Sequence, residues 1–154
     1  MLIRWSLERL NTMTPEELKT LIESDATAMA AATAEDWSTV ASRCGVIAPT
    51  VRVPVPSSDV RREAALNGVW ANIVLAARAG SAAPDQIKGI CITFTDWVLH
   101  SPTLDFDLLQ VQAMAGGLIA AGICTQEQYD ALSALGNQSQ TFTALECRVA
   151  MKGE

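Results

Sequence analysis

The stretch VRVPVPSSDVRREA, residues 51–64, interrupts a chain that otherwise has helical periodicity. Proline has no amide proton, and successive residues of an extended strand direct their N–H groups to opposite edges. Pro54 and Pro56 therefore remove hydrogen-bond donors from one edge only. The alternating valines keep their donors on the other edge and share one face of the strand; they are Val51, Val53 and Val55. The pattern predicts an extended segment at 51–57 that pairs along a single edge.

Two sources could complete that edge. Thr143, Leu145, Cys147 and Val149 alternate as in a strand, so residues 141–150 could form a two-stranded ribbon with the valines. A neighbouring protein could supply the strand instead, because an isolated ribbon is marginally stable. A polyproline-like connector that crosses the helices without pairing is the third interpretation. Our hypothesis is that residues 51–56 and 141–150 are contact elements.

The polar cluster at residues 57–59 predicts a helix that runs to about Ala79 and stops at Gly80. A second helix begins at Pro84 and ends near His100, before Pro102. We expect these two helices to form the centre of the core. Their predicted inward residues are Leu66, Val69, Trp70, Ile73, Val74 and Ala77 on the first, and Ile87, Ile90, Cys91, Phe94, Trp97 and Val98 on the second.

A third helix is predicted after Asp105, closed by Gly122, and a fourth between Thr125 and Gly136. The short connection predicts that these two helices form an αα-hairpin, with close backbone approach at the Gly116-Gly117 pair. Their predicted inward residues are Leu108, Val111, Met114, Ala115 and Leu118, followed by Tyr129, Leu132 and Leu135.

The N-terminal part has the clearest helix start, at Thr14-Pro15 with two glutamates in the first turn. Residues 25–45 predict two short helices, the second capped by Thr33 and ended by Gly45. Their predicted inward residues are Met29, Trp37, Val40 and Ala41. Residues 2–10 predict a short amphipathic helix, and Met13 is an alternative translation start.

Together these features predict a mainly α protein, a small single-domain helical bundle of about six helices with a minor extended or β-ribbon element. We assign residues 1–12 to an N-terminal amphipathic extension and residues 13–140 to the helical domain. Residues 141–154 are assigned to a C-terminal extended tail.

The composition excludes several classes of partner. The formal charge of −6 disfavours nucleic acid, because phosphate binding needs clustered Lys and Arg. Apolar segments such as residues 114–123 are too short to span a membrane, and the charged start is unlike a cleavable signal peptide. The four cysteines lie far apart in sequence and are expected to be buried free thiols.

The sequence predicts no catalytic residues, no metal site and no cofactor. His100 is the single histidine, at a helix end where it would contact the last carbonyls. Asp105 and Asp107 directly precede a helix, so capping explains them better than metal binding. Trp70 and Trp97 fit inward stripes, whereas Trp5 lies on a terminal helix and is predicted to anchor a partner. The predicted partner-binding residues are Trp5, Val51, Val53, Val55, Phe142 and Leu145.

Two long stretches carry a resemblance. GVWANIVLAARAGSAAPDQIKGICITFTDWV (68–98) and DFDLLQVQAMAGGLIAAGICTQEQYDALSALGNQSQT (105–141) resemble small, alanine-rich helical proteins encoded by tailed double-stranded DNA phages near virion and tail genes. The similarity covers roughly residues 13–145, including TPEEL and VPVP, and transfers no functional residue.

The resemblance implies a viral context, in the virion or the host cytoplasm. We expect a non-enzymatic structural or interaction protein, a tail-associated virion component that belongs to a homo- or hetero-oligomer and binds neighbouring subunits through extended segments and apolar helix surface. The alternative is a phage-encoded inhibitor of a host defence or regulatory protein, and a small helical enzyme has the least support.

Overall fold

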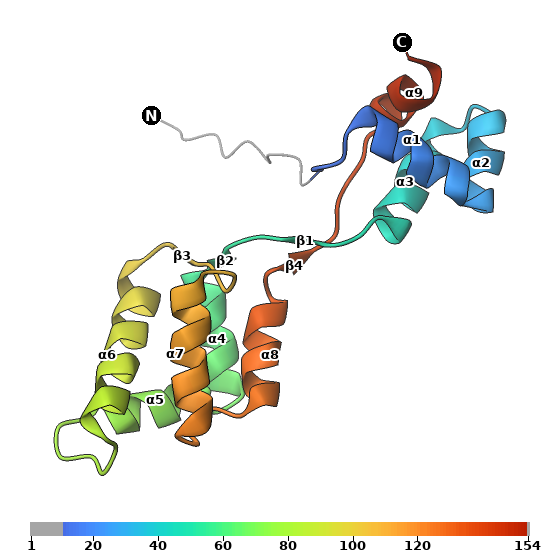
Figure 1. Cartoon of the computed structure of the whole chain (residues 1–154). Helices are drawn as coiled ribbons and strands as arrows, with labels where there is room; N and C mark the ends of the chain where they lie inside the picture. Colours follow the sequence, from blue (N-terminus) through green and yellow to red (C-terminus); the bar gives the residue numbers. More distant parts are fainter. Residues whose placement is uncertain (1–10, 154) are drawn as a thin grey trace, which may run out of the picture. The chain divides into compact units, whose positions relative to one another are not determined.

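The computed structural model describes residues 11–153, which are mainly helical (Figure 1). These residues contain nine helices instead of the predicted six or so. The chain divides into two compact units, although the sequence predicts one domain. The described part of the first unit comprises residues 11–51 and 138–153, and the second unit comprises residues 52–137. Each unit has its own apolar core.

Four helices form the first unit: α1 (Pro15–Ser24), α2 (Ala26–Thr33), α3 (Trp37–Ile47) and α9 (Ala144–Lys152). As predicted, Thr14 caps α1, through a reciprocal capping box with Glu17. The predicted cap of α3 is wrong. Thr33 belongs to α2, where its hydroxyl donates to the Met29 carbonyl, and Asp36 caps α3 by accepting from the Thr39 amide. Gly45 lies inside α3, which continues to Ile47.

The predicted extended tail at 141–154 is wrong over residues 144–152, which form α9. Thr143 caps this helix, and Glu146 accepts from the Thr143 amide in return, which makes a capping box. Packing follows helical spacing, with Cys147 buried and Ala150 and Met151 packed against the same core. The alternation of apolar residues was misleading because Leu145 and Arg148 face solvent while position 147 faces inward.

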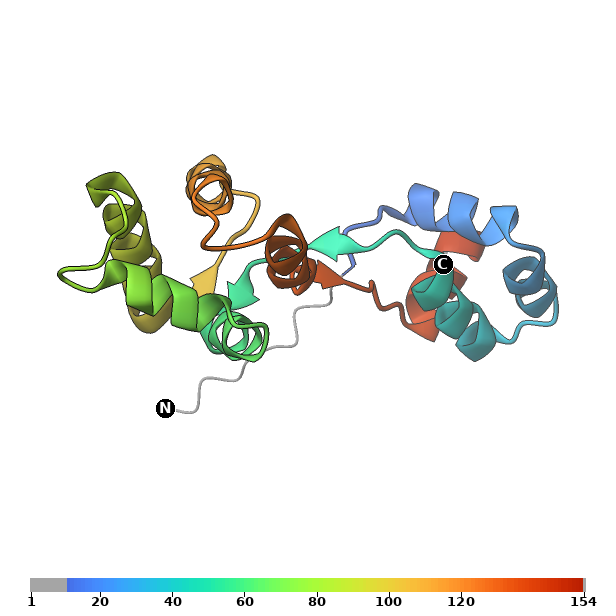
Figure 2. The ribbon, with the colours of Figure 1, turned by 90° about the horizontal axis from the view of Figure 1, so that it is seen from below.

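Figures 1 and 2 show α9, from the end of the chain, lying against both α1 and α3. The core of this unit consists of small and medium side chains contributed by all four helices: Leu18, Ile22, Ala28, Ala32, Val40, Cys44 and Cys147. Met29, Trp37 and Ala41 pack against it, as predicted for the inward face. The alanines allow the short helices to approach closely.

Five helices form the second unit: α4 (Ser57–Leu66), α5 (Val69–Ala77), α6 (Asp85–His100), α7 (Leu109–Ala120) and α8 (Gln126–Ala134). The single helix predicted from 57 to about 79 is broken at Asn67-Gly68. Gly68 has a positive φ of 85°, and the Asn67 side chain accepts from the Val69 amide. This break leaves Leu66 78% exposed instead of inward.

The core of the second unit includes most of the predicted inward residues. Val69, Ile73, Cys91, Phe94, Val98, Val111, Leu118 and Leu132 are buried there, whereas Leu108 is 49% exposed. As predicted, Thr125 caps α8. The predicted αα-hairpin is not the main packing arrangement, because α7 packs against α6 and α8 against α4. Close approach is found at Gly117, where a Cβ would lie 2.9 Å from Ile90 Cδ1, but not at Gly116.

The proline segment is extended, as predicted, but its pairing differs. β2 (Val55–Pro56) pairs antiparallel with β3 (Thr103–Leu104), with Val55 opposite Leu104. β1 (Val51–Arg52) pairs with β4 (Asn137–Gln138), and the boundary between the units runs through both of these strands. Two-residue strands carry too little alternation to be recognised from sequence.

Asp107, one of the two aspartates before α7, forms an ion pair with Arg52. The Arg52 guanidinium contacts Asp107 at 3.1 Å and also donates to the Ser133 carbonyl and the Asn137 side chain. The prediction that Asp105 and Asp107 cap α7 is therefore wrong, since the N-cap residue Leu108 makes no side-chain cap. Asp105 instead accepts from the Asp107 amide in the preceding turn.

Candidate functional site

The extended segment that carries Val51, Val53 and Val55 pairs with other segments of the same chain. The Val53 amide donates to the Gly136 carbonyl at 2.9 Å, and Val51 belongs to the β1 and β4 pair. Val55 is 2% exposed in the core of the second unit. These valines therefore do not offer a free edge to another protein, and the hypothesis that 51–56 is a contact element is corrected. The Val53 amide is bonded within the chain, and Val51 and Val55 belong to strands that pair within the chain.

The other predicted partner-binding residues have different environments. Trp5 lies outside the described residues. Phe142 is half-buried and packs against the core of the first unit. Leu145 is 65% exposed on α9, so it is the most exposed of the predicted partner-binding residues that the structure describes.

Ionisable groups in residues 11–153 do not gather into a cluster of three or more His, Cys, Asp or Glu side chains able to hold a metal ion. All four cysteines are buried and free, as predicted. His100 closes α6 with Nδ1 at 2.9 Å from Asp96 Oδ1 and 3.1 Å from the Asp96 carbonyl, in agreement with the predicted helix-end contact. None of the described helices is long and apolar enough to cross a membrane.

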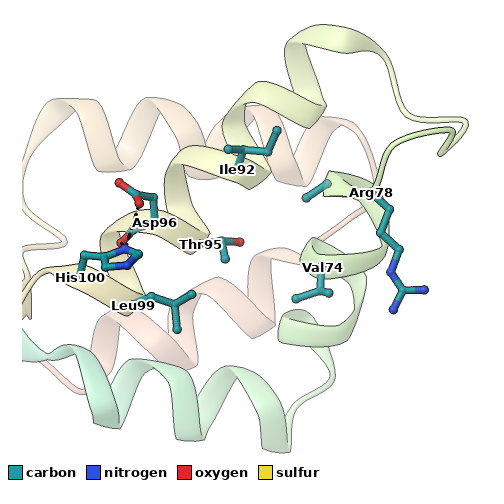
Figure 3. A pocket seen from close by; sticks show the side chains of 8 residues that line it. Val74, Arg78, Ile92, Thr95, Asp96, Leu99 and His100 are labelled. Atoms are coloured by element: carbon teal, nitrogen blue, oxygen red, sulfur yellow. Dashed lines mark hydrogen bonds and ion pairs between the residues drawn. The ribbon is translucent and has the colours of Figure 1, made fainter.

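The surface feature that stands out is an open, apolar groove between α5 and α6, with a volume of 340 Å³ (Figure 3). We call it the α5–α6 groove. Its lining residues are Val74, Ala77 and Arg78 from α5 and its C-cap, and Ile92, Thr95, Asp96, Leu99 and His100 from α6.

The groove follows from the side-chain pattern of the two helices. On α6, Ile92 and Leu99 lie two turns apart with Thr95 between them, so they form a second stripe beside the buried one. The buried stripe consists of Cys91, Phe94 and Val98. Ile92 is 55% and Leu99 48% exposed, although both are large aliphatic residues. The small side chains of Ala77 and Thr95 leave the hollow between them open.

Sequence reasoning found the buried stripe of α6 and missed the exposed one. The signal was present, because positions 92 and 99 are apolar and seven residues apart. Their exposure depends on which neighbouring helices cover α6. In the structure α4, α5 and α7 all contact α6, yet Ile92 and Leu99 remain 55% and 48% exposed.

The polar groups of the groove do not form a catalytic arrangement. The Thr95 hydroxyl donates to the Cys91 carbonyl within the helix, so it is already satisfied. The side chains of Asp96 and His100 pair with one another and are 67% and 72% exposed. Arg78 makes no hydrogen bond or ion pair with the side chains described here. The groove therefore offers apolar contact area flanked by solvated charges.

Comparisons with models of protein families, with curated proteins and with solved structures find no match to this chain.

Proposed function

We propose that this protein is a non-enzymatic interaction protein that binds another polypeptide through the α5–α6 groove. The observation that carries the proposal is the exposure of Ile92 and Leu99, two turns apart on α6, in the lining of an apolar groove. Covering a fully exposed aliphatic side chain of this size contributes about 1.5–3 kcal/mol, and these two are about half exposed. Contiguous apolar surface beside polar residues is typical of a protein interface.

A binding role explains the groove better than a chemical one. Catalysis by His100 would require a nucleophile or a substrate pocket beside it, and the neighbouring Thr95 hydroxyl is engaged by the helix backbone. The groove is open and its lining has few polar groups. Such a surface can bind one face of a helix or an extended peptide from another protein.

The biological setting that we propose is a phage particle, in which the protein is a tail-associated subunit that contacts neighbouring subunits. The support for this setting is the resemblance of residues 68–98 and 105–141 to small phage-encoded helical proteins. An uncovered apolar face also suits a subunit that is completed by assembly.

The test compares particles that carry the wild type with particles that carry a groove variant, Ile92→Glu/Leu99→Glu. Leu66→Glu is the matched control, because Leu66 is exposed to 78% on α4 and lines no part of the groove. Circular dichroism first establishes that all three proteins are folded. Mass spectrometry of purified particles should then detect the wild type and the control at equal abundance and the groove variant at least about tenfold less.

Equal incorporation of the groove variant would rule out the groove as the contact surface. Absence of the wild type itself from particles, together with early expression, would contradict the virion setting and support the host-directed inhibitor.

A further inference from the structure

The two sides of the α5–α6 groove carry opposite charges. Figure 3 shows Arg78 on one side, beyond Val74, and Asp96 with His100 on the other. Ile92, Thr95 and Leu99 lie between them. The surface of the groove is therefore cationic at Arg78, apolar in the middle and anionic at Asp96.

Both charges are available to another molecule. Arg78 extends from the C-cap of α5 and has no ion-pair partner among the residues that the structure describes. Asp96 contacts His100 through one carboxylate oxygen, and its side chain remains 67% exposed. The best complement to this groove is a surface with an anionic group opposite Arg78, an apolar centre, and a cationic group opposite Asp96.

We propose that the occupant of the groove is the same groove of a second copy of this chain, so that the protein forms a two-fold symmetric homodimer. This inference rests on the proposed function and names its partner. In a two-fold interface the same patch is used by both protomers and is turned by 180°. A two-fold axis through the centre of the groove places Arg78 of one protomer opposite Asp96 of its partner, and it does so twice.

The apolar part of the groove is also self-complementary. The hollow above Ala77 and Thr95 is bordered by two large side chains, Ile92 and Leu99. The same rotation places the apolar middle of one groove against the apolar middle of the other. Each protomer then covers the aliphatic groups that are exposed in the other, which removes apolar surface from water on both sides.

The experiment is a charge-swap cycle on the full chain, with dimerisation measured by analytical ultracentrifugation at low salt. Arg78→Glu alone and Asp96→Arg alone each place like charges opposite one another, so each should raise the dimer Kd about tenfold or more. The double variant R78E/D96R restores opposite pairs and should return the Kd to within about threefold of wild type. Arg61→Glu on α4 is the control for Arg78→Glu, since it changes the net charge by the same amount outside the groove.

A chain that remains monomeric at high micromolar concentration would overturn the homodimer, as would a double variant no better than the single ones. A monomer that still needs Ile92 and Leu99 to enter particles would indicate an unrelated partner, so that the homodimer fails while the proposed function stands. Dimerisation that persists in I92E/L99E would show that copies associate through another surface.

Discussion

Asp25 shows how one side chain joins two helices of the first unit. Its carboxylate accepts from the Ala28 amide as the N-cap of α2, and it accepts two hydrogen bonds from Arg43 on α3, at 3.1 and 2.9 Å. The Arg43 hydrogen bonds, followed by the bond from the Ala28 amide, lower the pKa of Asp25 from 3.8 to about 2. The carboxylate is therefore held in its charged form by the fold.

This pKa shift predicts how stability depends on pH. A lowered pKa means that the charged Asp25 stabilises the fold fully above about pH 4, and this stabilisation is lost as the pH falls towards 2. Asp25→Asn keeps an acceptor for the cap and removes the charge. Wild type should have the higher denaturant midpoint at pH 7, and the difference should shrink between pH 4 and pH 2. A difference that does not change with pH would contradict the role of the Arg43 pair.

At the level of elements, glycine decides where one predicted helix becomes two. Gly68 has φ of 85° and separates α4 from α5, whereas Gly89 lies inside α6, and a Cβ at either position would meet no atom within 4 Å. Gly68→Ala should therefore destabilise the protein by about 1 kcal/mol through backbone strain. Gly89→Ala should stabilise it by about 0.5–1 kcal/mol through helix propensity and a less flexible unfolded chain. Chemical denaturation measures both, and effects of the same sign would be inconsistent with a left-handed break at Gly68.

The C-terminal helix gives a second prediction at this level. The Thr143 hydroxyl accepts from the Glu146 amide at 3.2 Å at the start of α9. Thr143→Ala removes that acceptor and should lower the free energy of unfolding by about 1 kcal/mol. Thr143→Ser keeps the hydroxyl and should stay within about 0.5 kcal/mol of wild type. If residues 141–150 formed a strand, the serine variant would be no better than the alanine variant.

For the whole molecule, the main consequence of the fold is that one chain builds two separate cores. Cys44 and Cys147 are buried together in the core of the first unit, and Cys91 and Cys124 in the core of the second. Burial raises the pKa of Cys91 and Cys124, and the hydrogen bond with Cys44, together with burial, raises the pKa of Cys147. The thiols therefore report on the integrity of each core.

Pulse labelling with N-ethylmaleimide at increasing denaturant, read by peptide mass spectrometry, tests this division. All four cysteines should label slowly in the native protein. Cys44 and Cys147 should become reactive in one transition, and Cys91 and Cys124 in another, because each pair shares a core. Simultaneous exposure of all four would show that the two units unfold as one.

Local signals in the sequence predicted much of the helical structure. Thr14 and Thr125 were recognised as caps because a hydroxyl next to the first turn satisfies free amides there. The limits of α6 and its buried stripe were also predicted correctly. The cap of α3 was misplaced because Thr33 and Asp36 are both common N-cap residues, and only Asp36 accepts from an amide of the first turn of α3. The start of α9 was missed because the alternating apolar residues resembled a strand, although Thr143 and Glu146 have the spacing of a capping box.

The candidate site could not be predicted in the same way. Whether Val53 and Val55 face a partner depends on the positions of Gly136 and Leu104, which are about 50 or more residues away in the chain. Whether Ile92 is buried depends on which helices cover α6. Both are long-range packing outcomes, and short sequence patterns carry no information about them.

The sequence alone determined that the chain is mainly helical, that its thiols are buried and that residues 51–57 are extended, because helix caps, apolar periodicity and proline act over a few residues. Three further properties emerge only from the three-dimensional packing: the chain forms two cores, the valine strand pairs within the chain, and the stripe at Ile92 and Leu99 stays uncovered. Burial depends on contacts between segments distant in sequence, which a local pattern cannot specify.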